Sequence, residues 1–217
     1  MSPRIGSAVV STIACAVLGT TAANASAATT VALWHMDETS GTVMRDAVRN
    51  HSGTLRRVTL GLPGFLGTAY GFTTSDVTVP SANDLNPGSA NLTVTLRMKT
   101  TKKPSTPDWD LIRKGQYTTS GGEFKMEYQP TGQASCGFKG SKAYSELIAG
   151  PSIKDNRWHT VQCVKTSSAI QLVVDGRVFS KAAVIGNIGN SAPVIIGSYP
   201  GAEYFKGALD EASIAIG

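Results

Sequence analysis

The stretch from 155 to 179 alternates apolar and polar residues so regularly that it leaves few folds open to the chain. Its two β-rich runs, HTVQCVK and IQLVVD, are separated by a short polar break. Ile170, Leu172 and Val174 share one face of the second run, because successive side chains of a strand point to opposite faces. The Asp-Gly pair at 175–176 follows, and such a pair tolerates the positive φ angles of a tight hairpin turn. The pattern predicts a meander of antiparallel strands with one face toward a core.

Similar short runs, separated by turn residues, continue through most of the chain. NLTVTLRMKT alternates apolar residues with Thr, Arg and Lys, and EFKMEY repeats the pattern. Gly and Pro recur between the runs, and no segment shows the period of an amphipathic helix. These features predict an all-β sandwich and not an α/β fold. Strands are expected at residues 29–37, 69–72, 76–80, 91–100, 123–128, 159–165, 169–175, 192–197 and 207–216, with a loop-like section from 38 to about 66.

The first 27 residues are typical of a secretory signal. Arg4 precedes an apolar run at 8–18, and small residues then lead to Ala27. The apolar run is shorter than the roughly 20 residues that span a bilayer, which argues against a retained anchor. We therefore predict that residues 1–27 are a signal peptide and that residues 28–217 form one exported domain.

Charge narrows the possible partners. Removal of Arg4 lowers the net charge from +5 to +4, and the basic residues are scattered without an aromatic-interleaved stripe. Such a mild positive charge does not indicate nucleic-acid binding. No later stretch is long and apolar enough to cross a membrane. We expect neither a nucleic-acid partner nor membrane insertion after signal cleavage.

Two cysteines remain once the signal, which contains Cys15, is removed. Cys136 and Cys163 both lie in strand-like runs, and an isolated pair in an oxidising compartment predicts a disulfide. The bridge would join either neighbouring strands of one sheet or the two sheets. It closes a loop of roughly 25 residues, which the chain-entropy model equates with about 3 kcal/mol of stabilisation. A metal or redox site would need more ligands or a C-x-x-C spacing.

The order of motifs along the chain resembles the laminin-G-like family of concanavalin A-like jelly rolls. The matching pieces are LWHMDETSG, FLGTAYGF, VTVP, NLTVTLRMKT, DLIRKG, DNRWHTVQC, LVVDGRV, VIIGS and YFKGALDEASI. The resemblance implies two antiparallel sheets packed face to face, with the first and last strands adjacent and the domain filling residues 28–217. The family contains lectins, adhesion modules, binding domains attached to glycosidases and some glucanases, so the fold alone does not define an activity.

No catalytic constellation is recognisable. The E-x-D-x-x-E pattern of the glucanase branch is missing, and so are G-x-S-x-G and H-E-x-x-H. The nearest arrangement is Glu123 and Glu127 on either side of Lys125. Two residues four apart on a strand are too distant for the usual carboxylate spacing of about 5 to 9.5 Å. We expect a solvated outer face there, and no enzyme.

Four acids are candidate ligands for a metal ion. If the first and last strands pair antiparallel, Asp37 and Glu38 lie beside Asp210 and Glu211. Four carboxylates at one rim repel one another unless a cation or basic groups intervene, and Ca²⁺ accepts such oxygen ligands. Many members of the resembled family hold such an ion. The alternative is that these acids cap turns and pair with Arg or Lys.

Aromatic residues in loop-like positions are the candidate ligand contacts. Their rings could stack on sugars while nearby polar groups bind hydroxyls, although each could also be a packing residue. The leading hypothesis is a secreted, non-catalytic module that binds carbohydrate at a cell wall or extracellular matrix. The alternatives are a glycoside hydrolase of the same fold and an adhesion domain that recognises an extracellular protein. The candidate contacts are Trp109, Tyr117, Tyr144, Tyr199 and Tyr204.

Overall fold

A computed structural model describes residues 28–105 and 107–217 of the chain. The described part is built almost entirely from strands, with one short 3-10 helix. The elements are β1 (Thr29–Trp34), β2 (Val43–Met44), β3 (Gly53–Arg56), β4 (Thr59–Pro63), β5 (Thr68–Phe72), β6 (Asp76–Val79), η1 (Asn83–Leu85), β7 (Leu92–Lys99), β8 (Trp109–Lys114), β9 (Glu123–Tyr128), β10 (Ala134–Lys139), β11 (Tyr144–Ala149), β12 (His159–Lys165), β13 (Ala169–Val174), β14 (Arg177–Ala182), β15 (Val194–Ile196) and β16 (Gly207–Ile216).

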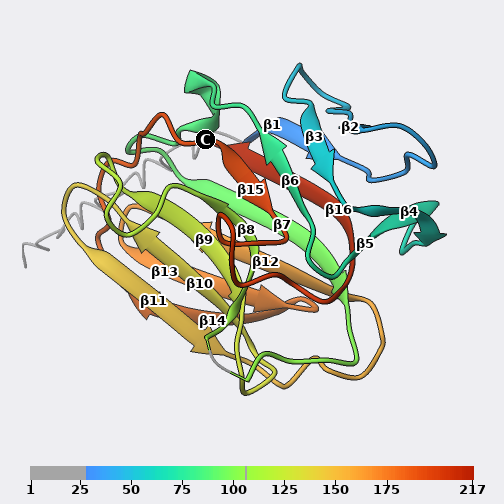
Figure 1. The fold of residues 1–217 in the computed structure, drawn as a ribbon. Coiled ribbons are helices and arrows are strands. Elements are labelled where there is room, and N and C mark those ends of the chain that lie inside the picture. The colour runs from blue at the N-terminus through green and yellow to red at the C-terminus, as the bar shows by residue number, and fades with distance from the viewer. Residues whose placement is uncertain (1–27, 106) are drawn as a thin grey trace, which may run out of the picture.

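The strands form two sheets that pack face to face (Figure 1). Sheet A has the order β14-β13-β12-β7-β16-β5-β4, with β1 also paired to β16. Sheet B has the order β11-β10-β9-β8-β15-β6-β3-β2. The neighbouring strands run antiparallel, including β7 with β12 in sheet A and β8 with β9 in sheet B. The predicted all-β, two-sheet antiparallel sandwich is confirmed.

The beginning and the end of the domain lie side by side, as expected. β1 pairs with β16, and Trp34 lies opposite Ala212. The Trp34 side chain is fully buried, and its indole Nε1 donates to the carbonyl of His51 at 2.7 Å. This hydrogen bond satisfies the buried indole nitrogen and fixes β1 to the loop that contains His51.

The meander predicted from 155 to 179 is formed by β12, β13 and β14. Asp175 and Gly176 turn the chain between β13 and β14 with φ angles of 51° and 82°, which are in the left-handed region. The Asp175 carboxylate accepts from the Thr160 amide at 2.8 Å and so fastens the turn to β12. The Asp-Gly pair therefore predicted the turn correctly, because both residues adopt the positive φ angles that the turn requires.

The prediction that residues 38 to about 66 are loop-like is partly wrong, because this section contains β2, β3 and β4. β2 and β4 are edge strands of their sheets. Gly61, with φ 70°, interrupts β4, and the register with β5 shifts between Thr59 and Leu62. Short edge strands with such irregularities lack the alternation by which strands are recognised in a sequence.

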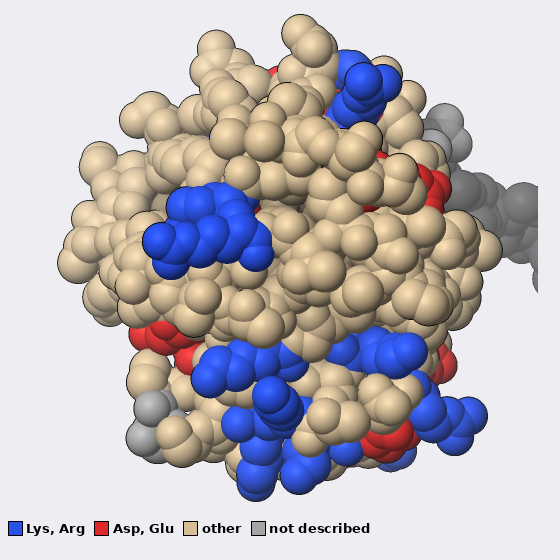
Figure 2. Space-filling model, turned by 45° about the vertical axis from the view of Figure 1, so that its right-hand side comes forward, with Lys and Arg blue, Asp and Glu red and all other residues tan. Residues whose placement is uncertain are grey.

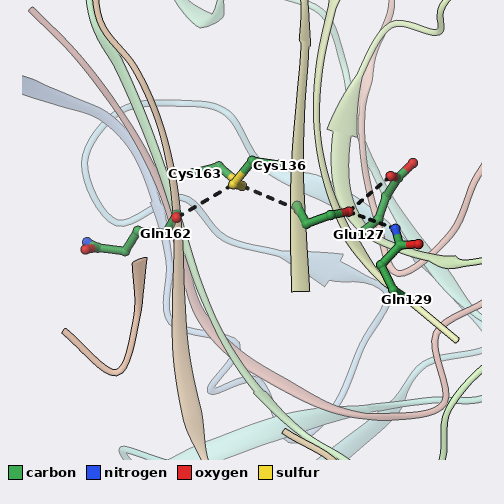
Figure 3. The surroundings of a disulfide bond; sticks show 6 residues. Glu127, Gln129, Cys136, Gln162 and Cys163 are labelled. Atoms are coloured by element: carbon green, nitrogen blue, oxygen red, sulfur yellow. Dashed lines mark hydrogen bonds between the residues drawn. A yellow bond between two sulfur atoms is a disulfide. The ribbon is translucent and has the colours of Figure 1, made fainter. Parts of the chain in front are cut away.

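The predicted disulfide joins Cys136 to Cys163, with a Cα–Cα distance of 5.4 Å. Cys136 belongs to β10 of sheet B and Cys163 to β12 of sheet A, so the bridge crosses the core and ties the two sheets together (Figure 3). The structure thus decides between the two placements that the sequence left open.

The core consists of the inner faces of both sheets. Leu92, Val94, Leu96 and Met98 of β7 are buried, in agreement with the predicted alternation. In the described residues, no helix has the length and apolar character needed to span a bilayer. The predicted signal peptide, residues 1–27, lies outside the described residues.

Candidate functional site

The outer face of sheet B carries a row of charged residues on β8 and β9. Glu123, Lys125 and Glu127 point away from the core, but they are not the solvated face expected from the sequence. Glu123 is 1% exposed and Glu127 is 2% exposed. The loop that leads to β16 contributes to this burial, because the Asp110 amide donates to the Glu203 carbonyl at 3.1 Å and so fastens the loop to β8.

A β-bulge brings two further charged residues onto this face. Asp110 pairs with Glu127 and Arg113 pairs with Lys125, so β8 has one more residue than β9 between these pairs. In a regular strand, residues three apart lie on opposite faces; the bulge places Asp110 and Arg113 on the same face. This local irregularity creates the charged cluster.

Arg113 is the centre of a buried ion-pair network. Its Nη1 donates to both carboxylate oxygens of Asp110 at 3.1 Å, and its Nη2 donates to Glu123 Oε2 at 2.7 Å. The Lys125 ammonium donates to Glu127 Oε1 at 2.6 Å. Buried charges are tolerated only when they are paired in this way, so the network fixes the side chains of the face.

Three carboxylates of this face, Asp108, Asp110 and Glu127, form what we call the acid triad. One oxygen from each lies within 4.8 Å of the others. Burial raises the pKa of Asp110 well above its usual value, and the charges of Glu127 and Glu203 add to this effect, whereas Arg113 opposes it. Burial likewise raises the pKa of Glu127 to about 7, against the opposing charge of Lys125. This cluster of mainly buried acids could hold a metal ion, since hard cations prefer carboxylate oxygens.

Neutral groups complete the hydrogen bonds around the triad. Gln129 donates to Asp108 Oδ2 at 3.3 Å and to the Ser135 hydroxyl at 2.8 Å. The Ser135 hydroxyl donates in turn to Glu127 Oε2 at 3.4 Å. Ser135 precedes Cys136, so the residue beside the disulfide on β10 is part of this polar face.

Three of the five predicted aromatic contacts line one hollow, the tyrosine hollow, of ≈ 250 Å³ above this face. Tyr117 and Tyr144 pack edge to face with ring centroids 5.3 Å apart, and the Arg113 guanidinium lies 4.6 Å from the Tyr199 ring centroid. Tyr117 remains 58% exposed. Glu123, Lys125 and Glu127 belong to the same lining.

The other two aromatic residues, Trp109 and Tyr204, line the tryptophan hollow of ≈ 370 Å³. Trp109 packs on Tyr128 and Phe205 with centroid distances of 6.2 Å, so its ring is fixed in place. Arg56 Nη2 donates to the Tyr204 hydroxyl at 3.0 Å. Glu203 lines both hollows, which are therefore neighbours. The fold brings together all five residues, but their role in ligand binding stays a prediction.

The acids predicted to bind Ca²⁺, which we call the rim acids, have partners of their own. Asp37 accepts from the Thr68 amide at 2.7 Å, and Glu38 accepts from the Arg45 amide at 2.8 Å. Asp210 accepts from the amides of Phe65 and Leu66 at 2.7 and 3.2 Å. Glu211 pairs with His35 Nδ1 at 2.9 Å, an ion pair when this imidazole is protonated. These contacts resemble the alternative in which the acids cap turns, and a Ca²⁺-binding role for them stays a prediction.

Sequence reasoning missed the acid triad, although it considered Glu127. Asp110 and Glu127 lie on neighbouring strands and become close only through the pairing of β8 with β9. The one available signal was the DLIRKG motif, in which an acid and an arginine interrupt an otherwise apolar run. A strict two-residue period places Asp110 and Arg113 on opposite faces, so only the structure, with its bulge, shows that they lie on the same face.

Comparison with known proteins agrees with this architecture. The Laminin_G_3 family, described as the concanavalin A-like lectin/glucanases superfamily, matches residues 71–215. A search of curated protein sequences gave no match.

Several solved structures are similar in fold. Domain 4 of AbnA, a GH43 extracellular arabinanase from Geobacillus stearothermophilus solved in complex with arabinotriose, is 18% identical with a TM-score of 0.68, covering 88% of this chain and 93% of that one. The binding domain of botulinum neurotoxin DC in complex with rat synaptotagmin II is 11% identical with a TM-score of 0.63, covering 85% of this chain and 47% of that one.

Domains LG4-5 of the mouse laminin alpha1 chain are 16% identical with a TM-score of 0.55, covering 78% of this chain and 44% of that one. The chain thus spans about half the length of the neurotoxin and laminin structures that it matches. At these identities the likeness shows the fold alone. Because the family match extends over more than half of the sequence, the chain belongs to the concanavalin A-like lectin/glucanase superfamily.

Proposed function

We propose that the chain is an extracellular, non-catalytic carbohydrate-binding module whose glycan lies across the tyrosine and tryptophan hollows. The observation that carries this proposal is the gathering of five aromatic side chains in two hollows that share Glu203. The arabinotriose complex of AbnA domain 4 supports it by fold likeness. The signal-like residues 1–27 and the disulfide agree with export.

The geometry suits sugar recognition. An aromatic face stacks on the apolar face of a sugar ring, and fixed polar groups then select among the hydroxyls. Tyr117 offers an exposed ring, and the Lys139 ammonium lies 4.2 Å from its centroid. Glu203 lies where a sugar chain would pass from one hollow to the other. The ion pairs of Arg113 and Lys125 fix the charged lining of the tyrosine hollow before the ligand arrives, which lowers the ordering cost of binding.

The test is calorimetric titration with arabino-oligosaccharides, followed by a glycan array. Tyr117→Ala should weaken binding about tenfold, because one stacked ring contributes on the order of 1.4 kcal/mol. Val178→Ala is the matched control, because Val178 is 57% exposed on β14 of the other sheet. Equal affinity of the two variants would remove the tyrosine hollow from the proposal. A complete lack of glycan binding would favour the protein-recognising adhesion domain instead.

The proposal includes a Ca²⁺ ion at the acid triad. Asp108, Asp110 and Glu127 could each supply one oxygen, and water or sugar hydroxyls would complete the shell of six to eight ligands that Ca²⁺ takes. Ca²⁺ at about ten times its Kd should raise the free energy of unfolding by about 1.4 kcal/mol. Asp108→Asn should remove this gain, whereas Asp37→Asn at the rim should keep it. The opposite pattern would move the ion to the rim acids.

A second candidate, glycan hydrolysis, is favoured by one observation. Glu127, with its pKa raised to about 7, lies beside Asp110, and a carboxylic acid protonated near neutral pH is what a glycosidase uses to protonate a leaving group. Release of reducing sugar from any array glycan, abolished by Glu127→Gln, would support this candidate. Binding without product release would support the non-catalytic module.

A further inference from the structure

A third hollow adjoins the tryptophan hollow at the end of β7. It measures ≈ 360 Å³ and lies between β5, the end of β7 and the start of β16. Its charged lining residues are Lys99, Lys102 and Lys206, and no Asp or Glu is among the described residues that line it. We call it the lysine hollow. Its hydrogen-bonding side chains include those of Thr73, Thr101 and Asn156.

The positive charge of this hollow has no acidic partner among the residues that the structure describes. Within residues 28–105 and 107–217, none of its three lysines forms an ion pair with a carboxylate, in contrast to Arg113 and Lys125. The Lys99 ammonium lies 5.6 Å from the Trp158 ring centroid, and the Lys206 ammonium lies 5.6 Å from that of Trp109. Aromatic contacts hold an ammonium in place but leave its charge available to an anion.

One buried hydroxyl holds this arrangement together. Thr100, 3% exposed, donates through Oγ1 to the Lys206 carbonyl at 2.6 Å and accepts from the Lys102 amide at 3.0 Å. The Thr100 carbonyl accepts from the Asn156 amide at 3.0 Å. The backbone at three lining positions is therefore fixed by one residue. Lysines on a fixed backbone need less ordering when they bind an anion than lysines on a free loop.

The wider surface has the same sign. Figure 2 brings forward the side of the molecule on which β4 and β5 lie in Figure 1, and Lys and Arg side chains gather toward its lower end with few Asp or Glu side chains among them. A surface potential of one sign attracts a ligand of the opposite sign and speeds its encounter.

The lysine and tryptophan hollows form one path for a ligand. Thr73 and Lys206 line both of them. Beyond Lys206 the positive charge is balanced, because the tryptophan hollow contains Asp108 and Glu203 as well as Lys103 and Lys206. A polymer with a negative charge on every unit would gain no net electrostatic attraction there. A polymer that carries its acidic groups on only some units would fit both hollows.

From this arrangement we infer that the ligand is an acidic polysaccharide with a largely neutral backbone. Its carboxylate or sulfate groups bind in the lysine hollow, and its neutral rings stack on Trp109. This inference rests on the proposed carbohydrate-binding function and adds the charge class of the glycan. It also distinguishes such a glycan from nucleic acid, which carries one charge per nucleotide.

The experiment uses one polymer in two forms. Glucuronoxylan has a neutral xylose chain with glucuronate branches, and reduction of its carboxyl groups removes the charge while keeping the backbone. Calorimetry at low salt should show tighter binding of the acidic form. Lys99→Gln/Lys102→Gln should weaken that binding about tenfold and leave the reduced polymer unaffected, because two charge contacts are lost.

The matched control is Lys142→Gln/Lys181→Gln, which removes the same charge elsewhere. Lys142 lines a hollow together with Ser89, just before β7 begins, and Lys99 lies at the other end of that strand. Lys181 lies on β14. The control pair should bind both polymers as the unaltered chain does. An equal loss of affinity in both double variants would mean that binding depends on general charge attraction. DNA that binds as tightly as the acidic polymer would mean the same, and either result would overturn the inference.

Failure of the inference is distinguishable from failure of the proposed function. If the acidic and reduced polymers bind equally and the Lys99→Gln/Lys102→Gln variant is unchanged, the inference is wrong and the carbohydrate module stands. If neither polymer nor any array glycan binds, both are wrong. Melting curves of each variant show whether the fold is retained.

Discussion

Two groups of carboxylates in this domain are satisfied in opposite ways. Three of the rim acids accept from backbone amides, as Asp210 does from Phe65 and Leu66. The inner members of the acid triad are instead neutralised by side chains, Asp110 by Arg113 and Glu127 by Lys125. A backbone amide stays in place whatever side chain its residue carries, whereas an ion pair is lost when its Arg or Lys is replaced. The rim acids therefore hold loops in place, and the inner acids of the triad depend on the counter-charges of their own face.

The largest effect should follow from breaking the buried network. Arg113→Gln leaves Asp110 and Glu123 as buried carboxylates without their main counter-charge, which should lower the free energy of unfolding by about 3–5 kcal/mol. Urea denaturation measures this loss.

The control for that variant is Arg49→Gln. Arg49 pairs with Asp84 at 2.6 Å, but the two side chains are 41% and 38% exposed, so the loss should stay within about 1 kcal/mol. Similar losses for the two arginine variants would contradict the view that the outer face of sheet B is a buried charge network.

A smaller effect should follow from removing a rim acid. Asp210→Ala deprives the Phe65 and Leu66 amides of their acceptor, which should cost about 1–3 kcal/mol. Hydrogen exchange should quicken at these two amides before the rest of sheet A is affected. If both amides stay protected, Asp210 does not hold the turn between β4 and β5.

The smallest effect, when measured over a single pH unit, should be on the pH dependence of stability. Burial raises the pKa of Glu127 from 4.5 to about 7 and that of Asp210 from 3.8 to about 6. In these ranges the folded chain holds protons that the unfolded chain has lost, so the free energy of unfolding should fall as the pH rises. Glu127→Gln should flatten the slope up to pH 7, and Asp210→Asn only up to pH 6. An unchanged slope between pH 6 and 7 in the Glu127 variant would contradict the raised pKa.

Local sequence patterns were sufficient for the layers of the fold. The alternation in β7 and β9, the Asp175-Gly176 turn and the two cysteines each depend on neighbours within a strand or on the chemistry of one residue type. They therefore predicted strands, a hairpin and a disulfide that the structure contains.

The candidate site was only partly predictable, because its geometry depends on pairing between strands. A single extra residue in β8 puts Asp110 and Arg113 on one face, and the loop that carries Glu203 covers them from a distant part of the chain. The five aromatic residues could be proposed as ligand contacts from the sequence. Their division between two hollows could not be predicted from it. The irregularities of a sheet are set by tertiary contacts that a two-residue period does not contain.

The disulfide has a consequence for when the binding face is complete. It anchors β10 at Cys136, and the preceding Ser135 presents its hydroxyl to Glu127 and Gln129 on the opposite surface of the same strand. With both sulfurs reduced, the cross-link that fixes β10 to sheet A would be absent. The position of the Ser135 hydroxyl would then be less well fixed. We therefore expect the thiol form of the proposed module to bind its ligand less tightly than the disulfide form.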